Sequence, residues 1–157
     1  MLTCACGRGQ GSDMAQGGKP ACDDAGFLRL QSGFADGSLS GDQLVDICGR
    51  VSSVGGARYT RSGRHGYFLV EIPGSVSQNG IEIVANLDAM AESSSDDPPV
   101  WPWVAEGDYV YVQGRYYYDS PLSQGIDWTE NDTDRNWPHP GYVVVCDAQK
   151  ARCNKYM

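Results

Sequence analysis

The chain has 157 residues, which is the usual size of one domain and enough for a single buried core. Its 12 basic and 20 acidic residues give a formal net charge of −8. This balance argues against a protein that coats duplex DNA or an anionic membrane surface. No apolar run approaches the roughly 20 residues of a membrane-spanning helix. We therefore expect one domain with no membrane span and no bulk binding to duplex DNA.

The first part of the chain, residues 1–42, carries nine glycines and little apolar periodicity. The exception is the apolar patch at 27–30, which is long enough for one or two helical turns. Such a composition is typical of a segment that contributes little to a core. The sequence thus predicts a flexible, glycine-rich, cysteine-bearing N-terminal arm over residues 1–42.

From residue 44 onward the pattern changes to apolar residues at alternate positions, separated by Gly, Pro and Asn, which is typical of short β-strands. Five segments have this pattern: 44–54, 66–72, 81–87, 108–118 and 141–145. The polar stretch at 93–99 predicts a loop or short helix between the third and fourth strands. The sequence predicts an all-β fold, a five-stranded OB-fold-like Greek-key barrel over residues 43–146 with a C-terminal tail at 147–157. A β-sandwich is the alternative.

Six cysteines, an even number, indicate an oxidising compartment and up to three disulfides. A zinc site is less favoured because no C-x-x-C pair occurs. We expect a local bridge between Cys146 and Cys153, and a bridge from Cys48 to Cys22. We also expect an exported protein, periplasmic or extracellular, whose signal peptide was removed before residue 1, because the first residues lack the features of such a peptide.

The alternation also predicts how the strands at 66–72 and 81–87 pair. If residues 73–80 close the hairpin symmetrically, Tyr67 lies opposite Asn86 and His65 opposite Asp88. His65 and Asp88 would then lie side by side on the outer face of the barrel, where OB-folds place ligands. We expect the turn at 127–130 to complete a polar cleft with them. A shift by one residue would bury acidic side chains, whereas a shift by two is cheaper.

The loop before residue 66 is basic, and it borders this predicted face. Arginines there would hold an anion, and tyrosines would stack on a ring. The sequence therefore predicts a binding module for an anionic or ring-containing ligand, such as a single-stranded nucleic acid or an oligosaccharide. The alternative is an ordinary exposed hairpin with solvated charges. The predicted ligand-binding residues are Arg58, Tyr59, Arg61, Arg64, Tyr67, Asn86 and Trp128.

The stretch at 125–142 holds four carboxylates within eight residues. Glu130, Asp132 and Asp134 alternate as oxygen ligands do in calcium loops, but the glycine and distal glutamate of an EF-hand are missing. A solvated acidic loop is the favoured interpretation. We therefore expect no cofactor, with calcium or another divalent metal as the alternative.

Two other functions stay open. One is a metal-dependent hydrolase or nuclease, although no mechanistic motif accompanies its candidate residues and binding is favoured over catalysis. The other is a structural subunit of a surface or filament assembly, self-associating through the N-terminal arm. The candidate catalytic residues are His65, Asp88, Asp127, Glu130 and His139.

Five short motifs occur in one order along residues 44–145: RHGYF at 64–68, ANLD at 85–88, GD at 107–108 with GRY at 114–116, DWTE at 127–130 and HPGY at 139–142. In this the chain resembles an uncharacterised family of small exported bacterial OB-fold-like proteins, a domain of unknown function marked by a His-Trp-Thr-His motif. The resemblance implies an exported bacterial protein and no known activity. Asp127, Glu130 and Ala85 replace histidines of the family, which argues against histidine-based chemistry here.

Overall fold

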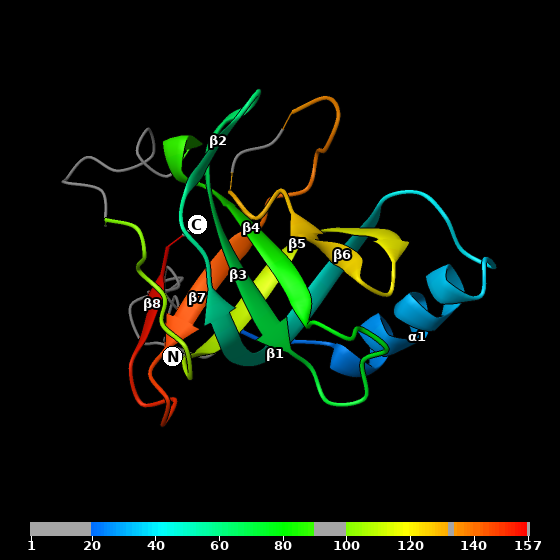
Figure 1. Cartoon of the computed structure of the whole chain (residues 1–157), viewed down its shortest axis with the longest axis horizontal. Helices are drawn as coiled ribbons and strands as arrows, with labels where there is room; N and C mark the ends of the chain where they lie inside the picture. Colours follow the sequence, from blue (N-terminus) through cyan, green and yellow to red (C-terminus); the bar gives the residue numbers. More distant parts are fainter. Residues whose placement is uncertain (1–19, 90–99, 132–133, 157) are drawn as a thin grey trace, which may run out of the picture.

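The computed structural model describes residues 20–89, 100–131 and 134–156. The fold is mostly β, with one long helix beside the sheet (Figure 1). In chain order the elements are α1 (Asp24–Ala35), β1 (Gln43–Val54), β2 (Arg58–Thr60), β3 (Gly63–Glu71), β4 (Ile81–Asn86), β5 (Tyr109–Ser120), β6 (Ser123–Asp127), β7 (Tyr142–Cys146) and β8 (Cys153–Lys155). None of the helices in this described part is long and apolar enough to cross a membrane.

Five strands close into a barrel in the order β1-β3-β4-β6-β5, and β5 returns to pair with β1. All neighbours are antiparallel except β4 and β6, which run parallel. β1 serves two sides of the barrel, since residues 43–50 pair with β5 and residues 50–54 pair with β3. Gly49 lies at this crossover, where a Cβ would collide with the Glu71 carbonyl oxygen. The closed barrel confirms the predicted all-β, OB-fold-like class.

The prediction of the fifth barrel strand was wrong. β6 fills that place: it forms a hairpin with the second half of β5 and lies parallel to β4, with Ile126 opposite Ile83. The predicted segment 141–145 does form a strand, β7, but β7 pairs with the first half of β5, outside the closed circuit. β6 has the sequence SQGID, in which Ile126 is the one strong strand former, so its pattern is too weak to predict a strand.

The predicted register of the β3–β4 hairpin was also wrong, by two residues. His65 pairs with Asn86 rather than with Asp88, and the same shift applies along the whole hairpin. After Asn86 the chain leaves the strand in a helical turn that contains Asp88. Side chains alternate with a period of two, so the shift leaves each one on its predicted face.

Two features of the structure favour this register. Glu82 lies opposite Leu69 and not opposite Glu71, so two carboxylates are not opposed across the hairpin. The loop after β3 is held by α1, because the side chain of Gln31 accepts a hydrogen bond from the backbone N–H of Val76 at 3.0 Å. The loop is therefore shaped by the helix and not by a symmetric turn.

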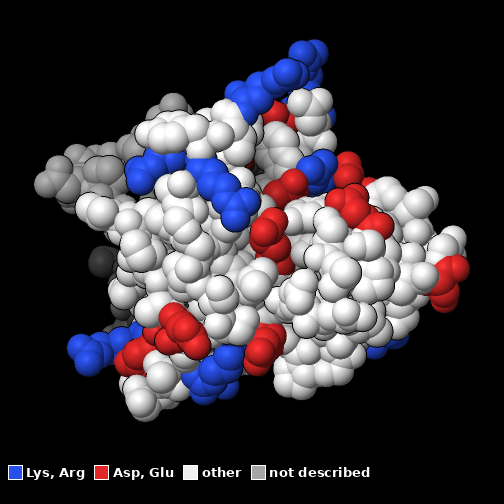
Figure 2. Space-filling model, viewed as in Figure 1, with Lys and Arg blue, Asp and Glu red and all other residues white. Residues whose placement is uncertain are grey.

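The predicted basic loop between the first two strands of the barrel contains a small hairpin of its own, formed by β2 and the start of β3. This β2–β3 hairpin projects beyond the barrel at the top of the molecule (Figure 1). Figure 2 shows basic side chains over its tip and acidic side chains on the surface below it. Arg58 and Arg61 are exposed, and Arg64 is half-buried. The hairpin thus separates the positive charge from the acidic surface beneath.

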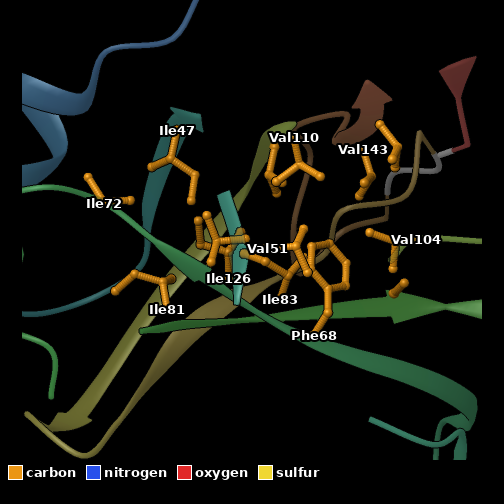
Figure 3. Packing of buried hydrophobic residues seen from close by; sticks show 14 of the residues in the cluster. Ile47, Val51, Phe68, Ile72, Ile81, Ile83, Val104, Val110, Ile126 and Val143 are labelled. Carbon is orange, nitrogen blue, oxygen red and sulfur yellow. The ribbon is translucent and has the colours of Figure 1, made fainter. Parts of the chain in front are cut away.

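The core lies inside the barrel and is built from the predicted inward faces. Figure 3 shows side chains from different strands meeting in one interior, among them Val51, Phe68 and Ile83. Phe68, Val70 and Ile72 are buried, as are Ile81, Ile83, Ala85 and Leu87, so the predicted inward faces of β3 and β4 are confirmed. Burial of these aliphatic and aromatic side chains supplies most of the free energy that favours folding.

The N-terminal arm needs correction where the structure describes it. Residues 24–35 form a helix of three turns rather than one or two, and Phe27 and Gln31 on it are each 1% exposed. Phe27 and Phe34 pack edge-on against Tyr116, with ring centroids 5.0 and 5.3 Å apart. α1 therefore belongs to the folded domain. The prediction of a flexible arm up to residue 42 was wrong for the helix at residues 24–35. Cys4 and Cys6 lie outside the described residues, as does the predicted loop at 93–99.

Both predicted disulfides are confirmed. Cys22 is bonded to Cys48, which ties the residues before α1 to β1. Cys146 is bonded to Cys153, and the C-terminal tail folds back so that β8 pairs with β7. Two disulfides in so small a domain indicate an oxidising compartment.

Candidate ligand-binding cleft

A cleft of about 830 Å³ lies on the outer face of the barrel, beside the β2–β3 hairpin. β3, β4, β5 and the turn after β6 supply its walls, and Thr60 and Ser62 of the hairpin line its rim. The structure brings together most of the predicted site residues here. The predicted residues that line the cleft are His65, Tyr67, Asn86, Asp88, Asp127, Trp128, Glu130 and Asp134.

His65 lies in the wall of the cleft and is 8% exposed. Its Nδ1 is 3.0 Å from the carbonyl oxygen of Gly63 and 3.2 Å from the hydroxyl of Thr60. Asp88 does not orient this ring, because its carboxylate instead accepts a hydrogen bond from the backbone N–H of Arg64 at 2.8 Å. The two residues share the cleft, as predicted, but the expected His–Asp pair does not form.

Asp127 is held by Arg115, a residue that the sequence analysis missed. The guanidinium donates two hydrogen bonds, from Nε to Oδ1 at 2.8 Å and from Nη2 to Oδ2 at 2.7 Å. The hydrogen bonds to Asp127 raise the pKa of Arg115. Both side chains are about three-quarters buried, at 29% and 26% exposed. Such a bidentate pair fixes the turn after β6 and offsets part of the negative charge of Asp127.

Trp128 follows directly and has φ = 50°, the left-handed region that bulky residues rarely adopt. Its neighbours hold this conformation. Thr129 is fully buried, and its hydroxyl donates to the carbonyl oxygen of Val84 at 2.8 Å. Gly141 packs on the turn, where a Cβ would lie 2.7 Å from Cα of Thr129, and its N–H donates to the carbonyl oxygen of Glu130 at 2.8 Å. A half-buried tryptophan is thereby fixed in the wall of the cleft.

Glu130 is half-buried at the end of the same turn. Burial raises its pKa most, and the negative charge of Asp127 adds to this. A hydrogen bond from the Asn86 side chain and the proximity of His65 oppose the shift. The cleft thus contains a carboxylate whose charge is poorly solvated.

Tyr117 is a second residue that the sequence analysis missed. Its hydroxyl donates to Oε1 of Glu82 at 2.8 Å, and burial followed by the nearby Glu82 carboxylate raises its pKa. Tyr117 and Arg115 share the outward face of β5, whereas Tyr116 between them points into the core. The alternation in GRYYY predicts that Arg115 and Tyr117 share a face of the strand. Their place in the cleft could not be predicted, because it depends on the pairing of β6 with β5.

The arginines of the β2–β3 hairpin lie at the edge of the cleft. The Arg58 guanidinium carbon is 4.6 Å from the centroid of the Tyr67 ring, so one predicted anion-binding residue covers a predicted stacking residue. Tyr59 is 83% exposed. The cleft itself is not lined by the four predicted ligand-binding residues of this hairpin, Arg58, Tyr59, Arg61 and Arg64.

Two other predicted residues do not join the site as expected. His139 is exposed, contacts the ring of Trp137 edge-on at 4.8 Å, and is not among the residues that line the cleft. Asp134 lines the cleft, but its carboxylate also accepts a hydrogen bond from the backbone N–H of Trp137 at 3.0 Å, which closes a local turn. Asp132 lies outside the described residues, so calcium binding by this stretch stays a prediction.

Within residues 20–89, 100–131 and 134–156, one group of three potential metal ligands lies close together: Cys22, Asp24 and Cys48. Cys22 and Cys48 are joined in a disulfide, and a disulfide offers no thiolate to a metal. Burial raises the pKa of Asp24. The short distances within this group therefore follow from the disulfide bond and do not indicate a metal site.

Comparison of the chain with protein-family models, with curated proteins and with solved structures found no match. The resemblance to the exported family stays a prediction. The function has to be inferred from the cleft.

Proposed function

We propose that this protein is an exported binding module whose cleft takes a ring-containing, hydroxyl-rich ligand, namely an oligosaccharide. The observation that carries the proposal is Trp128, a large ring fixed in the cleft wall in an unfavourable backbone conformation. Such a conformation costs about 1 kcal/mol or more and persists where the surroundings enforce it. A rigid aromatic platform suits a ligand that is recognised through the faces of its rings.

The polar groups of the cleft favour a sugar over a single-stranded nucleic acid. Asp88, Glu130 and Asp134 supply carboxylate oxygens, and Thr60 and Asn86 supply a hydroxyl and an amide. These groups bond to sugar hydroxyls, which both donate and accept. Proteins that track single strands line their grooves with basic residues, because each phosphate is negative. Of the two ligand classes predicted from the sequence, the carboxylates favour oligosaccharide.

The contacts of the candidate catalytic residues favour binding over hydrolysis. Glycoside hydrolysis commonly needs two carboxyl groups free to act on either side of the scissile bond. Of the three candidate carboxyl groups, Asp127 is engaged by both arms of the Arg115 fork and Asp88 accepts a hydrogen bond from the backbone N–H of Arg64, which leaves Glu130 without a second free carboxyl group among the candidates. His65 is bonded to Gly63 and Thr60, and His139 lies away from the cleft.

Export is part of the same proposal. The two disulfides support an oxidising compartment. The resemblance to a family of exported bacterial proteins adds the periplasm or the cell exterior as the compartment. Oligosaccharides and polysaccharides of the cell surface would be within reach of the protein there.

The proposal is tested by calorimetric titration of the protein and its Trp128→Gly variant with short neutral, cationic and anionic oligosaccharides and a single-stranded oligonucleotide. Glycine relieves the left-handed backbone, so we expect the variant to stay within about 1 kcal/mol of the parent in stability. We expect it to lose saccharide binding, and Trp128→Phe to retain part of it. Binding of the oligonucleotide alone, or undiminished saccharide binding by Trp128→Gly, would overturn the proposal.

A further inference from the structure

The buried histidine of the cleft presents a hydrogen-bond acceptor to the ligand. The Gly63 carbonyl oxygen can only accept, so Nδ1 of His65, at 3.0 Å from it, is the donor of this bond. In the tautomer that this bond selects, Nε2 is a lone-pair acceptor. His65 is 8% exposed and lines the cleft, and no residue of the described chain bonds to its Nε2. An unpaired acceptor in the wall of a cleft takes its donor from solvent or from a ligand.

The carboxylates around His65 add further acceptors without matching cations. Among the described residues, the salt bridges within 4.0 Å are Arg115 with Asp42 and Asp127, and Arg152 with Asp147. Asp88, Glu130 and Asp134 take part in none of them. Arg115 is the one arginine among the described residues that line the cleft, and its fork is on Asp127. The cleft is therefore rich in acceptors and negative charge and poor in free donors.

We infer that the ligand supplies the missing donors and the positive charge, and that it is an oligosaccharide of amino sugars with free ammonium groups. This inference rests on the proposed function and specifies its ligand. An ammonium group has three donors and no acceptor, which complements His65 Nε2 and Glu130. It also gains from the face of a tryptophan ring, which Trp128 provides. Glu130 carries most of the selectivity, because it is half-buried whereas the other unpaired carboxylates of the cleft, Asp88 and Asp134, are exposed.

Three probes of matched length separate the possibilities: a glucosamine oligomer, an N-acetylglucosamine oligomer and a galacturonic acid oligomer. The first is cationic, the second is its uncharged counterpart and the third is anionic. We expect the glucosamine oligomer to bind at least roughly tenfold more tightly than the other two at low salt, the ratio expected for one charge-assisted hydrogen bond. We expect this preference to decrease as salt is added.

Glu130→Gln is the decisive variant, because it keeps the shape and removes the charge. We expect it to lose roughly tenfold in affinity for the glucosamine oligomer and to change affinity for the N-acetylglucosamine oligomer little. Glu106→Gln makes the same exchange at an exposed position outside the cleft and serves as the control. Asp88→Asn is a second cleft variant at an exposed site, which keeps the test valid if Glu130→Gln does not fold.

The outcomes separate this inference from the proposed function. Equal affinity for the cationic and neutral oligomers, tighter binding of the galacturonic acid oligomer, or an unchanged preference in both cleft variants would overturn the inference. In each case Trp128-dependent saccharide binding would leave the proposed function standing. If none of the three oligomers bound and the broader saccharide panel also failed, the proposed function would fall with it.

Discussion

At the scale of single residues, two features of the cleft lower the stability of the folded protein. Trp128 has a left-handed backbone, and Glu130 has a carboxylate withdrawn from water. Strained backbone conformations and carboxylates with shifted pKa values are concentrated at functional sites, where they position groups for a ligand. Neither feature is visible in the sequence. The left-handed turn is held by the hydrogen bond from Thr129 to Val84 and by the packing of Gly141 on the turn, and both contacts form only in the folded chain.

Glu130 gives a prediction about pH. Its pKa in the folded protein is raised above the ordinary value of 4.5. Between these two values the folded protein holds a proton that the unfolded chain has released, so Glu130 lowers stability as the pH rises through this window. Above the folded pKa the loss is complete. We therefore expect Glu130→Gln to be more stable than the parent at neutral pH and to differ little from it below pH 4.5.

Urea unfolding at several pH values measures this difference, and Glu106→Gln again serves as the control. A Glu130→Gln variant that is less stable than the parent at neutral pH would show that the carboxylate stabilises the fold. In that case the buried charge of Glu130 would not lower the stability of the folded protein.

At the scale of elements, alternation predicted which faces point inward but not which strands pair. Phe68 and Ile83 repeat at period two with apolar neighbours, and their burial follows from the pattern alone. β6 lacks such a pattern and becomes a strand because β5 and β4 flank it. The loop that joins β3 to β4 is bonded to α1, through Gln31 and the backbone N–H of Val76, which are 45 residues apart in the sequence. The alternation of apolar residues does not predict this contact. The cleft could be predicted despite this, because a shift of two preserves the face.

Gln31 is therefore expected to couple the helix to the barrel. It is 1% exposed, and its amide donates to Gln124 at 2.7 Å and to Ser75 at 2.8 Å. We expect Gln31→Leu to cost about 2 to 3 kcal/mol, because the buried side chain of Gln124 loses a donor and the backbone N–H of Val76 loses its acceptor. Thermal and urea unfolding measure the loss, with Ser32→Ala on the exposed side of α1 as the control. A cost as small as that of the control would mean that the loop is held by other contacts.

The β2–β3 hairpin gives a prediction on charge. Reversal of Arg58, Arg61 and Arg64 to glutamate removes the positive rim beside the cleft. We expect stability to change by less than about 1 kcal/mol, because Arg58 and Arg61 are exposed, Arg64 is half-buried, and none of the three forms a salt bridge among the described residues. We expect binding of the galacturonic acid oligomer to weaken and binding of the glucosamine oligomer to tighten at low salt, since the rim repels a cation. Parallel changes for both oligomers would indicate that the hairpin acts through shape and not through charge.

At the scale of the whole molecule, the domain is a small barrel with α1 tied to it and the tail folded back on it. The Cys22–Cys48 bond spans 26 residues and the Cys146–Cys153 bond spans 7. By loop-closure entropy the first contributes about 3.5 kcal/mol and the second about 2.4 kcal/mol. The cysteine count and spacing predicted both bonds, because each pairs a cysteine on a strand with one on a flanking segment.

We accordingly expect the Cys22→Ser, Cys48→Ser double variant to be less stable than the Cys146→Ser, Cys153→Ser double variant. Unfolding of each protein in urea with and without reductant measures the difference. Reductant should lower the stability of each double variant further, because one of the two described bonds remains in each. The opposite ranking would show that strain or residual structure outweighs loop length.

We propose that the cleft beneath the β2–β3 hairpin binds a glucosamine oligomer. The most direct measurement is a nuclear magnetic resonance titration of isotope-labelled protein with that oligomer. We predict that the shifts concentrate on the indole N–H of Trp128, the side-chain amide of Asn86 and the backbone of β3 and β4 around His65. Shifts confined to the opposite side of the barrel, around Tyr109 and the Cys22–Cys48 bond, or no shifts at millimolar oligomer, would contradict the claim.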